Sequence, residues 1–116
     1  MSTRSVPEIG KGLIVSINPF TGEILREYEQ DSGQAIESKL QLASETFREY
    51  RKTSFAQRSQ MMNRAAEILE NGKENFGRLM TQEMGKTLRS AIQEAEKCAL
   101  GCRYYAENAE RFLADV

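Results

Sequence analysis

The longest unbroken helical pattern in the chain is residues 88–113, LRSAIQEAEKCALGCRYYAENAERFL. Apolar and small residues recur there at alternating steps of four and three, which aligns them on one helical face. They are Leu88, Ile92, Ala95, Ala99, Cys102, Ala106, Ala109 and Leu113. The alanines among them bury little area, although they let a neighbouring backbone approach closely. We therefore predict a long helix over about 87–114 whose thin seam needs bulkier partners from elsewhere.

Three more helices are predicted before it. The first, about 32–52, carries a stripe of Ile36, Leu40, Ala43, Phe47 and Tyr50. Thr53-Ser54 offers a second helix start, and Met62, Ala65, Ala66 and Leu69 form the stripe of a helix over about 55–71. Because Asn71-Gly72 is typical of a helix C-terminus, we expect that helix to end there. A short helix over about 74–84 then follows and is closed by Gly85.

A β-hairpin is predicted over residues 13–29. The β-branched run that begins at Leu13 is followed by Asn18-Pro19-Phe20-Thr21-Gly22, which has turn chemistry at nearly every position. The chain then returns as a second apolar run from Glu23 to Tyr28. Residues 1–12 are polar and are expected to form a flexible arm. The predicted fold class is mainly α with an N-terminal β-hairpin, in a single domain.

Composition excludes several classes of partner. With 16 Lys and Arg against 17 Asp and Glu, the chain has a net charge of -1 and no overall attraction to nucleic acid or an anionic membrane. It has no apolar run of about 18 residues, the length that a membrane span requires. The first residues lack the apolar stretch of a secretory signal. We therefore expect a cytoplasmic protein that binds neither nucleic acid nor membrane.

The residues present also exclude most kinds of active site. Histidine is absent, so no Ser/His/Asp or Cys/His arrangement is possible. Gly85-Lys86-Thr87 is not a P-loop, because Met80 stands where that motif needs a glycine, and no dinucleotide-binding glycine fingerprint occurs. We expect no catalytic, cofactor-binding or metal-binding residue in this chain.

Two residue pairs on the last helix have competing interpretations. Cys98 and Cys102 are expected to be buried small residues, with a metal clip or a reactive thiol as the alternative. The rings of Tyr104 and Tyr105 would point about 100° apart on a helix, so we expect one to pack inward and the other to cover the surface, with base stacking as the alternative.

Three stretches in register resemble one enzyme family. Asn18-Pro19-Phe20-Thr21-Gly22-Glu23 resembles the N-P-x-T-G-E turn near the start of aldehyde dehydrogenases. Glu83-Met84-Gly85-Lys86 is similar to the E-x-G-K segment before a long helix of that family, and 102–107, CRYYAE, resembles the aromatic-alanine stretch on that helix. The resemblance covers residues 13–116 and is strongest to the short bacterial succinate-semialdehyde dehydrogenases.

The resemblance implies a fold and an activity. Residues 13–116 would be the N-terminal part of the α/β aldehyde dehydrogenase fold, in which the hairpin and helices flank the cofactor-binding domain. The complete enzyme would use NAD or NADP to oxidise an aldehyde, here succinate semialdehyde to succinate, through a cysteine nucleophile and a glutamate base. In the family these groups lie downstream of the segment seen here, so the chain is expected to be a fragment that is inactive alone. Its partner would be the remainder of the dehydrogenase chain or a homo-oligomer.

The family also suggests two candidate site residues and leaves one alternative open. One side of the long helix borders the substrate entrance tunnel of the family, and Gln93 and Lys97 occupy the corresponding positions. Lys97 could attract the distal carboxylate of succinate semialdehyde, whereas an ordinary exposed lysine would contribute little. The alternative to an enzyme segment is a stand-alone helical interaction module derived from the same family.

Overall fold

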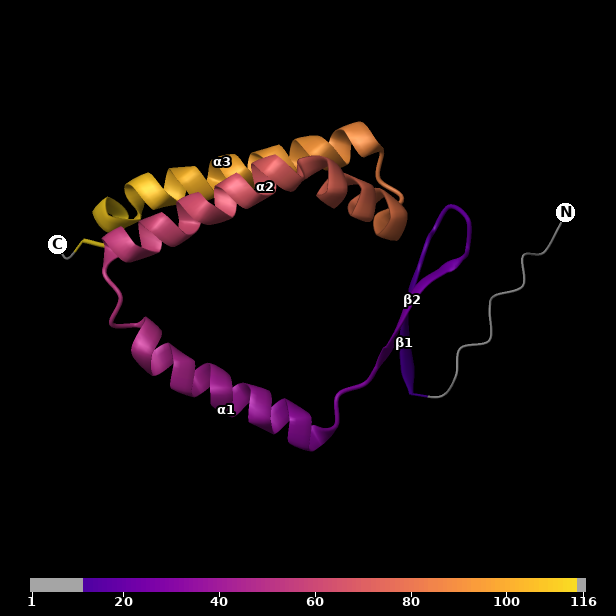
Figure 1. Ribbon diagram of the computed structural model, residues 1–116, viewed down its shortest axis with the longest axis horizontal. Coiled ribbons are helices and arrows are strands. Elements are labelled where there is room, and N and C mark those ends of the chain that lie inside the picture. Colours follow the sequence, from indigo (N-terminus) through magenta and orange to yellow (C-terminus); the bar gives the residue numbers. More distant parts are fainter. Residues whose placement is uncertain (1–11, 115–116) are drawn as a thin grey trace, which may run out of the picture.

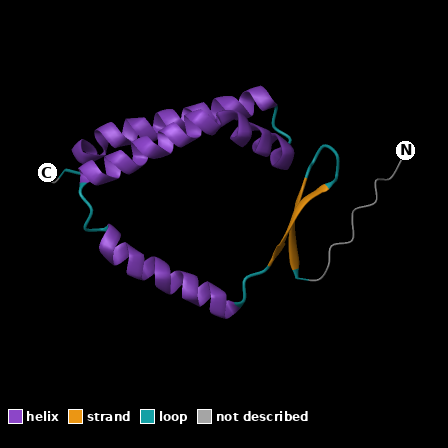
Figure 2. Ribbon diagram, in the orientation of Figure 1, coloured by secondary structure: helices purple, strands orange, loops and turns teal. Residues whose placement is uncertain are grey.

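The computed structural model describes residues 12–114, which form a two-stranded hairpin followed by helices (Figure 1). The elements are β1 (Leu13–Ile17), β2 (Ile24–Glu29), α1 (Gly33–Tyr50), α2 (Phe55–Met84) and α3 (Leu88–Phe112). The predicted class, mainly α with an N-terminal hairpin, is confirmed, as the helices and strands in Figure 2 show. The flexible arm predicted for residues 1–12 lies, apart from Gly12, outside the described residues.

The hairpin is antiparallel and closes through the predicted turn. Its register pairs Leu13 with Glu29 and Ile17 with Ile24, with an irregularity between Ser16 and Ile17. The Asn18 side chain accepts hydrogen bonds from the backbone N–H groups of Phe20 and Thr21, at 2.9 and 3.3 Å. Gly22 has φ +78°, a conformation that residues with a Cβ rarely adopt. Proline, asparagine and glycine therefore each have a separate physical role in this turn.

Helix α1 begins where the Ser32 hydroxyl caps it, by accepting a hydrogen bond from the Ala35 N–H at 3.1 Å. None of its residues is buried. The predicted stripe is present on the helix, but it faces solvent: Phe47 is 60% and Leu40 59% exposed. Figure 1 shows α1 set apart from the pair formed by α2 and α3. Within residues 12–114, extensive packing joins only α2 to α3 and β1 to β2.

Helix α2 corrects one prediction, because the two helices expected over 55–71 and 74–84 are a single helix from Phe55 to Met84. A capping box formed by Ser54 and Gln57 starts it. Gly72, expected to terminate the first helix, lies inside it without a positive φ, and an added Cβ there would lie 2.7 Å from the Phe76 ring. A glycine inside a helix costs only about 1 kcal/mol, which packing against α3 can offset. The stop comes at Gly85, whose φ of +71° forms a left-handed cap.

The seam between α2 and α3 is built from small residues. Its buried side chains are Ala66 of α2 and Ala91, Ala95 and Ala99 of α3. The backbones come close at Gly77, where an added Cβ would lie 2.8 Å from Ile92 Cγ1 and 3.2 Å from the Ile92 nitrogen. No large side chain is fully buried among the described residues. As the alanine pattern predicted, the helices approach closely but bury little area.

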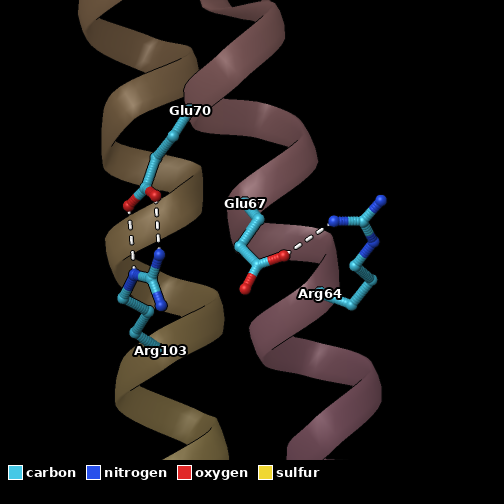
Figure 3. Close-up of polar contacts among 4 residues, drawn as sticks. All are labelled: Arg64, Glu67, Glu70 and Arg103. Atoms are coloured by element: carbon cyan, nitrogen blue, oxygen red, sulfur yellow. Dashed lines mark hydrogen bonds and ion pairs between the residues drawn. The ribbon is translucent and has the colours of Figure 1, made fainter.

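Ion pairs on one flank of this seam fix α3 against α2. The Arg103 guanidinium donates two hydrogen bonds to the Glu70 carboxylate, through Nε at 3.0 Å and Nη2 at 2.6 Å (Figure 3). Lys73 of α2 donates to Glu96 of α3 at 2.7 Å. Each helix contributes one acidic and one basic side chain to these pairs. The alanine stripe alone would allow the helices to pack in several registers, whereas the two ion pairs favour one register.

The hairpin is attached to the helical pair at the end of α2. The Ser16 hydroxyl donates to Glu83 Oε1 at 2.8 Å. Pro19 lies over Gly85, so that a Cβ on Gly85 would come within 3.1 Å of Pro19 Cγ. The turn and the left-handed glycine, which are both part of the family resemblance, thus meet in space.

The described chain is extended and leaves much apolar surface uncovered. Its principal extents are 63 × 41 × 25 Å and its radius of gyration is 19.7 Å, against roughly 13 Å for a compact 100-residue domain. The uncovered large apolar side chains include Ile36, Leu42, Met61, Ile68, Leu79, Leu100 and Leu113. In the part of the chain that is described, no helix is long and apolar enough to cross a membrane.

Candidate functional site

Both residues singled out from the sequence, Gln93 and Lys97, line one surface pocket along α3. The pocket has a volume of about 610 Å³. Its other lining residues are Lys86 from the loop between α2 and α3, and Ser90, Glu94 and Cys98 from α3. Successive residues four positions apart are neighbours on a helix surface. One such row, formed by Ser90, Glu94 and Cys98, lines the pocket.

The electrostatics of the pocket centre on Glu94. The Lys86 ammonium donates to Glu94 Oε2 and forms an ion pair with it. This hydrogen bond is the main reason that the pKa of Glu94 is lowered, followed by the charge of Lys86 and, more weakly, that of Lys97. Glu94 is therefore ionised at neutral pH and neutralises the charge of Lys86.

Lys97 has a different environment from Lys86. It is exposed on α3, one turn beyond Gln93. It lies close enough to Glu94 to lower the pKa of that carboxyl, yet it makes no ion pair or hydrogen bond recorded among residues 12–114. The charge of Lys97 thus remains available at the surface of the pocket.

Lys86, Ser90 and Glu94 were not identified from the sequence as members of this site. Lys86 and Glu94 are eight residues apart, and the turn between α2 and α3 brings them together. Lys86 belongs to Gly85-Lys86-Thr87 and to the E-x-G-K segment, and neither motif indicates a contact with Glu94. The rows of helix α3 could have indicated Ser90 and Glu94, since both lie within one turn of Gln93 or Lys97.

The two cysteines differ in exposure, and the prediction that both are buried is wrong. Cys98 is exposed and Cys102 is half-buried, and both are free thiols. Helix α2 covers the face of α3 that contains Ala99, and Cys98 is rotated about 100° from that residue. Cys98 therefore faces the pocket instead of the seam.

The prediction that one of Tyr104 and Tyr105 packs inward is also wrong in this chain, because both are exposed. The rings are 52% and 56% exposed. They meet each other edge to face at 5.4 Å between centroids, and Tyr104 also approaches Phe112 at 6.0 Å. Tyr105 lines a surface pocket together with Tyr50 of α1 and Phe55 of α2, but neither tyrosine is buried there.

The chemistry that this pocket can supply is recognition of an anion. Two ammonium groups, a hydroxyl and an amide offer hydrogen-bond donors, against a single carboxylate. Among residues 12–114, no group of three or more His, Cys, Asp or Glu could hold a metal ion.

Comparison with known proteins identifies the relatives of this chain. Residues 7–116 match the model of the aldehyde dehydrogenase family. The chain is 47% identical over 102 residues to a probable succinate-semialdehyde dehydrogenase [NADP(+)] from Synechocystis sp., and 46% identical over 102 residues to succinate-semialdehyde dehydrogenase [NADP(+)] 1 from Mycobacterium tuberculosis. Each alignment covers 88% of this chain and 22% of the relative. The chain thus spans about a fifth of the length of these curated relatives.

Solved structures agree with this assignment. The succinic semialdehyde dehydrogenase of Streptococcus pyogenes, solved with NADP+, superposes with a TM-score of 0.80 at 29% identity, over 86% of this chain and 22% of that one. The protein Gox0499 superposes with a TM-score of 0.84 at 28% identity, over 88% of this chain and 23% of that one. The arrangement of hairpin and helices is therefore that of a segment in these enzymes. On the family match and these relatives together, the chain belongs to the aldehyde dehydrogenase family.

Proposed function

We propose that this chain is the N-terminal segment of an NADP+-dependent dehydrogenase that oxidises succinate semialdehyde to succinate. The observation that carries the proposal is the 46–47% identity, over 102 residues, to dehydrogenases named for that substrate and cofactor. We propose NADP over NAD because the names of these relatives specify it. The free thiols Cys98 and Cys102 are in keeping with a cytoplasmic location.

In this proposal, the segment contributes surfaces and the remainder of the dehydrogenase contributes the reacting groups. The apolar face of α1 is uncovered over its whole length, and the α2–α3 seam is thin. Such faces gain free energy when they are buried, at about 25 cal/mol per Å² of apolar surface. The remainder of the enzyme would cover them, and the chain alone would be inactive.

Gln93 and Lys97 would border the path by which substrate enters the complete enzyme. Their support is a shared pocket on the exposed side of α3, away from the face that α2 covers. The charge of Lys97 would attract a substrate with a distal carboxylate over an uncharged aldehyde.

A chimeric enzyme tests the proposal. Residues 13–114 of this chain would replace the matching segment of the Synechocystis relative, and reduction of NADP+ with succinate semialdehyde would be measured. We expect the chimera to be active, whereas the isolated 116-residue chain should reduce no NADP+. A correctly folded chimera without activity, or turnover by the isolated chain, would refute the proposal.

A second candidate function is a helical module that binds intact dehydrogenase subunits. The observation in its favour is that α2 and α3 pack extensively against each other, whereas α1 does not pack extensively against either of them. Mixing the chain with an intact relative discriminates the two functions. The module would form a stoichiometric complex visible by size-exclusion chromatography, while the enzyme segment would not, because its place is already occupied.

A further inference from the structure

The pocket on α3 has an unequal balance of charges. Lys86 and Lys97 contribute two ammonium groups, and Glu94 contributes the only carboxylate among the lining residues. Glu94 is bound directly to Lys86. The uncompensated charge of the pocket is therefore that of Lys97.

Neutral donors lie beside that charge. Gln93 is one turn from Lys97 on α3, and Ser90 is one turn further toward the start of the helix. A carboxylate bound at Lys97 could accept hydrogen bonds from the Gln93 amide, and the Ser90 hydroxyl could reach the far end of a short ligand. The volume of about 610 Å³ lies within the range of small-molecule sites, roughly 300–1,000 Å³.

Lys86 is held back from such a ligand by Glu94. Its side chain is 32% exposed, and its ammonium group is directed to the carboxylate of Glu94 at the edge of the pocket. Loss of the Glu94 charge would release a second ammonium group into the same space. Glu94 thus determines whether the pocket presents one free cation or two.

We propose that this pocket recognises the carboxylate of short dicarboxylic acids and their semialdehydes, with Lys97 as the binding residue and Glu94 as the residue that limits the pocket to one free cation. The identity of the ligand rests on the proposed function, since succinate semialdehyde has a single carboxylate and succinate has two.

Binding of succinate to the full 116-residue chain tests this proposal without catalysis. The ¹⁵N-labelled chain would be titrated with sodium succinate at constant ionic strength, with neutral succinamide as the reference ligand. We expect saturable shifts of the amides near Ser90, Gln93 and Lys97 with succinate and none with succinamide. Lys97→Met should weaken binding roughly 10- to 100-fold, the effect of losing one charge-assisted hydrogen bond. Glu94→Gln should strengthen it.

Two further variants keep the result interpretable. Lys39→Met removes a lysine of α1 that pairs with Asp31 far from the pocket, so it should leave succinate binding unchanged. Lys97→Arg retains the charge and should retain most of the affinity. Equal shifts with succinamide, or equal affinity of the parent and Lys97→Met, would overturn the proposal whether or not the chimeric enzyme is active. An inactive chimera with intact succinate binding would instead count against the proposed function.

Discussion

Arg103 of α3 and Glu70 of α2, 33 residues apart in the chain, are joined by two parallel hydrogen bonds of 3.0 and 2.6 Å. The bonds from Arg103 lower the pKa of Glu70, and Glu70 in turn raises the pKa of Arg103. A second pair, Lys73–Glu96, lies on the same flank. The two helices are therefore held by charge where their alanines provide little area.

This geometry predicts an acid-sensitive contribution to stability. Because the folded-state pKa of Glu70 is lowered, the contribution is complete above the unfolded pKa and is lost as pH falls through the folded pKa. Arg103→Met should lower the melting temperature by a few degrees at pH 7, since the pair is partly exposed, and by less as the pH approaches 2. Circular dichroism melts across this range measure the difference.

Arg64→Met is the matched control, because Arg64 pairs with Glu67 within α2 and does not join the helices (Figure 3). It should change the melting temperature less than Arg103→Met at pH 7, and the difference between the two variants should shrink as the pH approaches 2. If both variants lose the same stability, then the Arg103–Glu70 pair between the helices contributes no more than the Arg64–Glu67 pair within α2.

The close approach at Gly77 predicts opposite effects of two glycine substitutions. Gly77→Ala should destabilise the chain by about 1–3 kcal/mol, because the new Cβ would lie 2.8 Å from Ile92 Cγ1 and 3.2 Å from the Ile92 nitrogen. Gly101→Ala meets nothing within 4 Å inside α3, and should stabilise the chain by about 0.5–1 kcal/mol. Urea unfolding measures both, and a stabilising Gly77→Ala would contradict the observed seam.

Gly85 predicts a coupling between hairpin and helices. Gly85→Ala should cost about 1–2 kcal/mol from its φ of +71°, and more from the approach of Pro19 Cγ to 3.1 Å. Adding Pro19→Ala should recover the stability lost through the contact with Pro19 Cγ, but not the stability lost through the positive φ. A double-mutant cycle by thermal unfolding separates them, and strictly additive effects would mean that the hairpin does not rest on Gly85.

The uncovered face of α1 predicts a defect that appears only in the complete enzyme. Phe47→Asp should leave the melting of the isolated chain nearly unchanged, because the ring is 60% exposed. In the chimera it should sharply reduce the yield of active enzyme, since a charge would be buried. Ser38→Asp, on the opposite side of the same helix, is the control and should be tolerated. Equal yields from both variants would show that this face stays in solvent.

Much of the fold follows from local patterns. The turn at Asn18–Gly22, the helix start at Ser54 and the helical pattern of α3 each depend on a few neighbouring residues, and all are observed. The continuity of α2 through Gly72 could not be predicted from Asn71-Gly72 alone, because a glycine inside a helix costs only about 1 kcal/mol and α2 also packs along α3.

The candidate site was predicted only in part for a similar reason. Gln93 and Lys97 were found by resemblance to the family, whereas the contact between Lys86 and Glu94 exists only once the chain has turned back at Gly85. The exposure of Cys98, Tyr104 and Tyr105 differs from prediction because helical spacing tells which residues share a face but not what covers that face.

The separation of α1 from the other helices has a consequence for the abundance of the chain in a cell. A helix whose apolar face is left in water is a target for chaperones, proteases and self-association, and each of these competes with productive assembly. The abundance of this polypeptide should therefore track the supply of whatever surface covers α1, and an excess of chain over that surface should be degraded or precipitate.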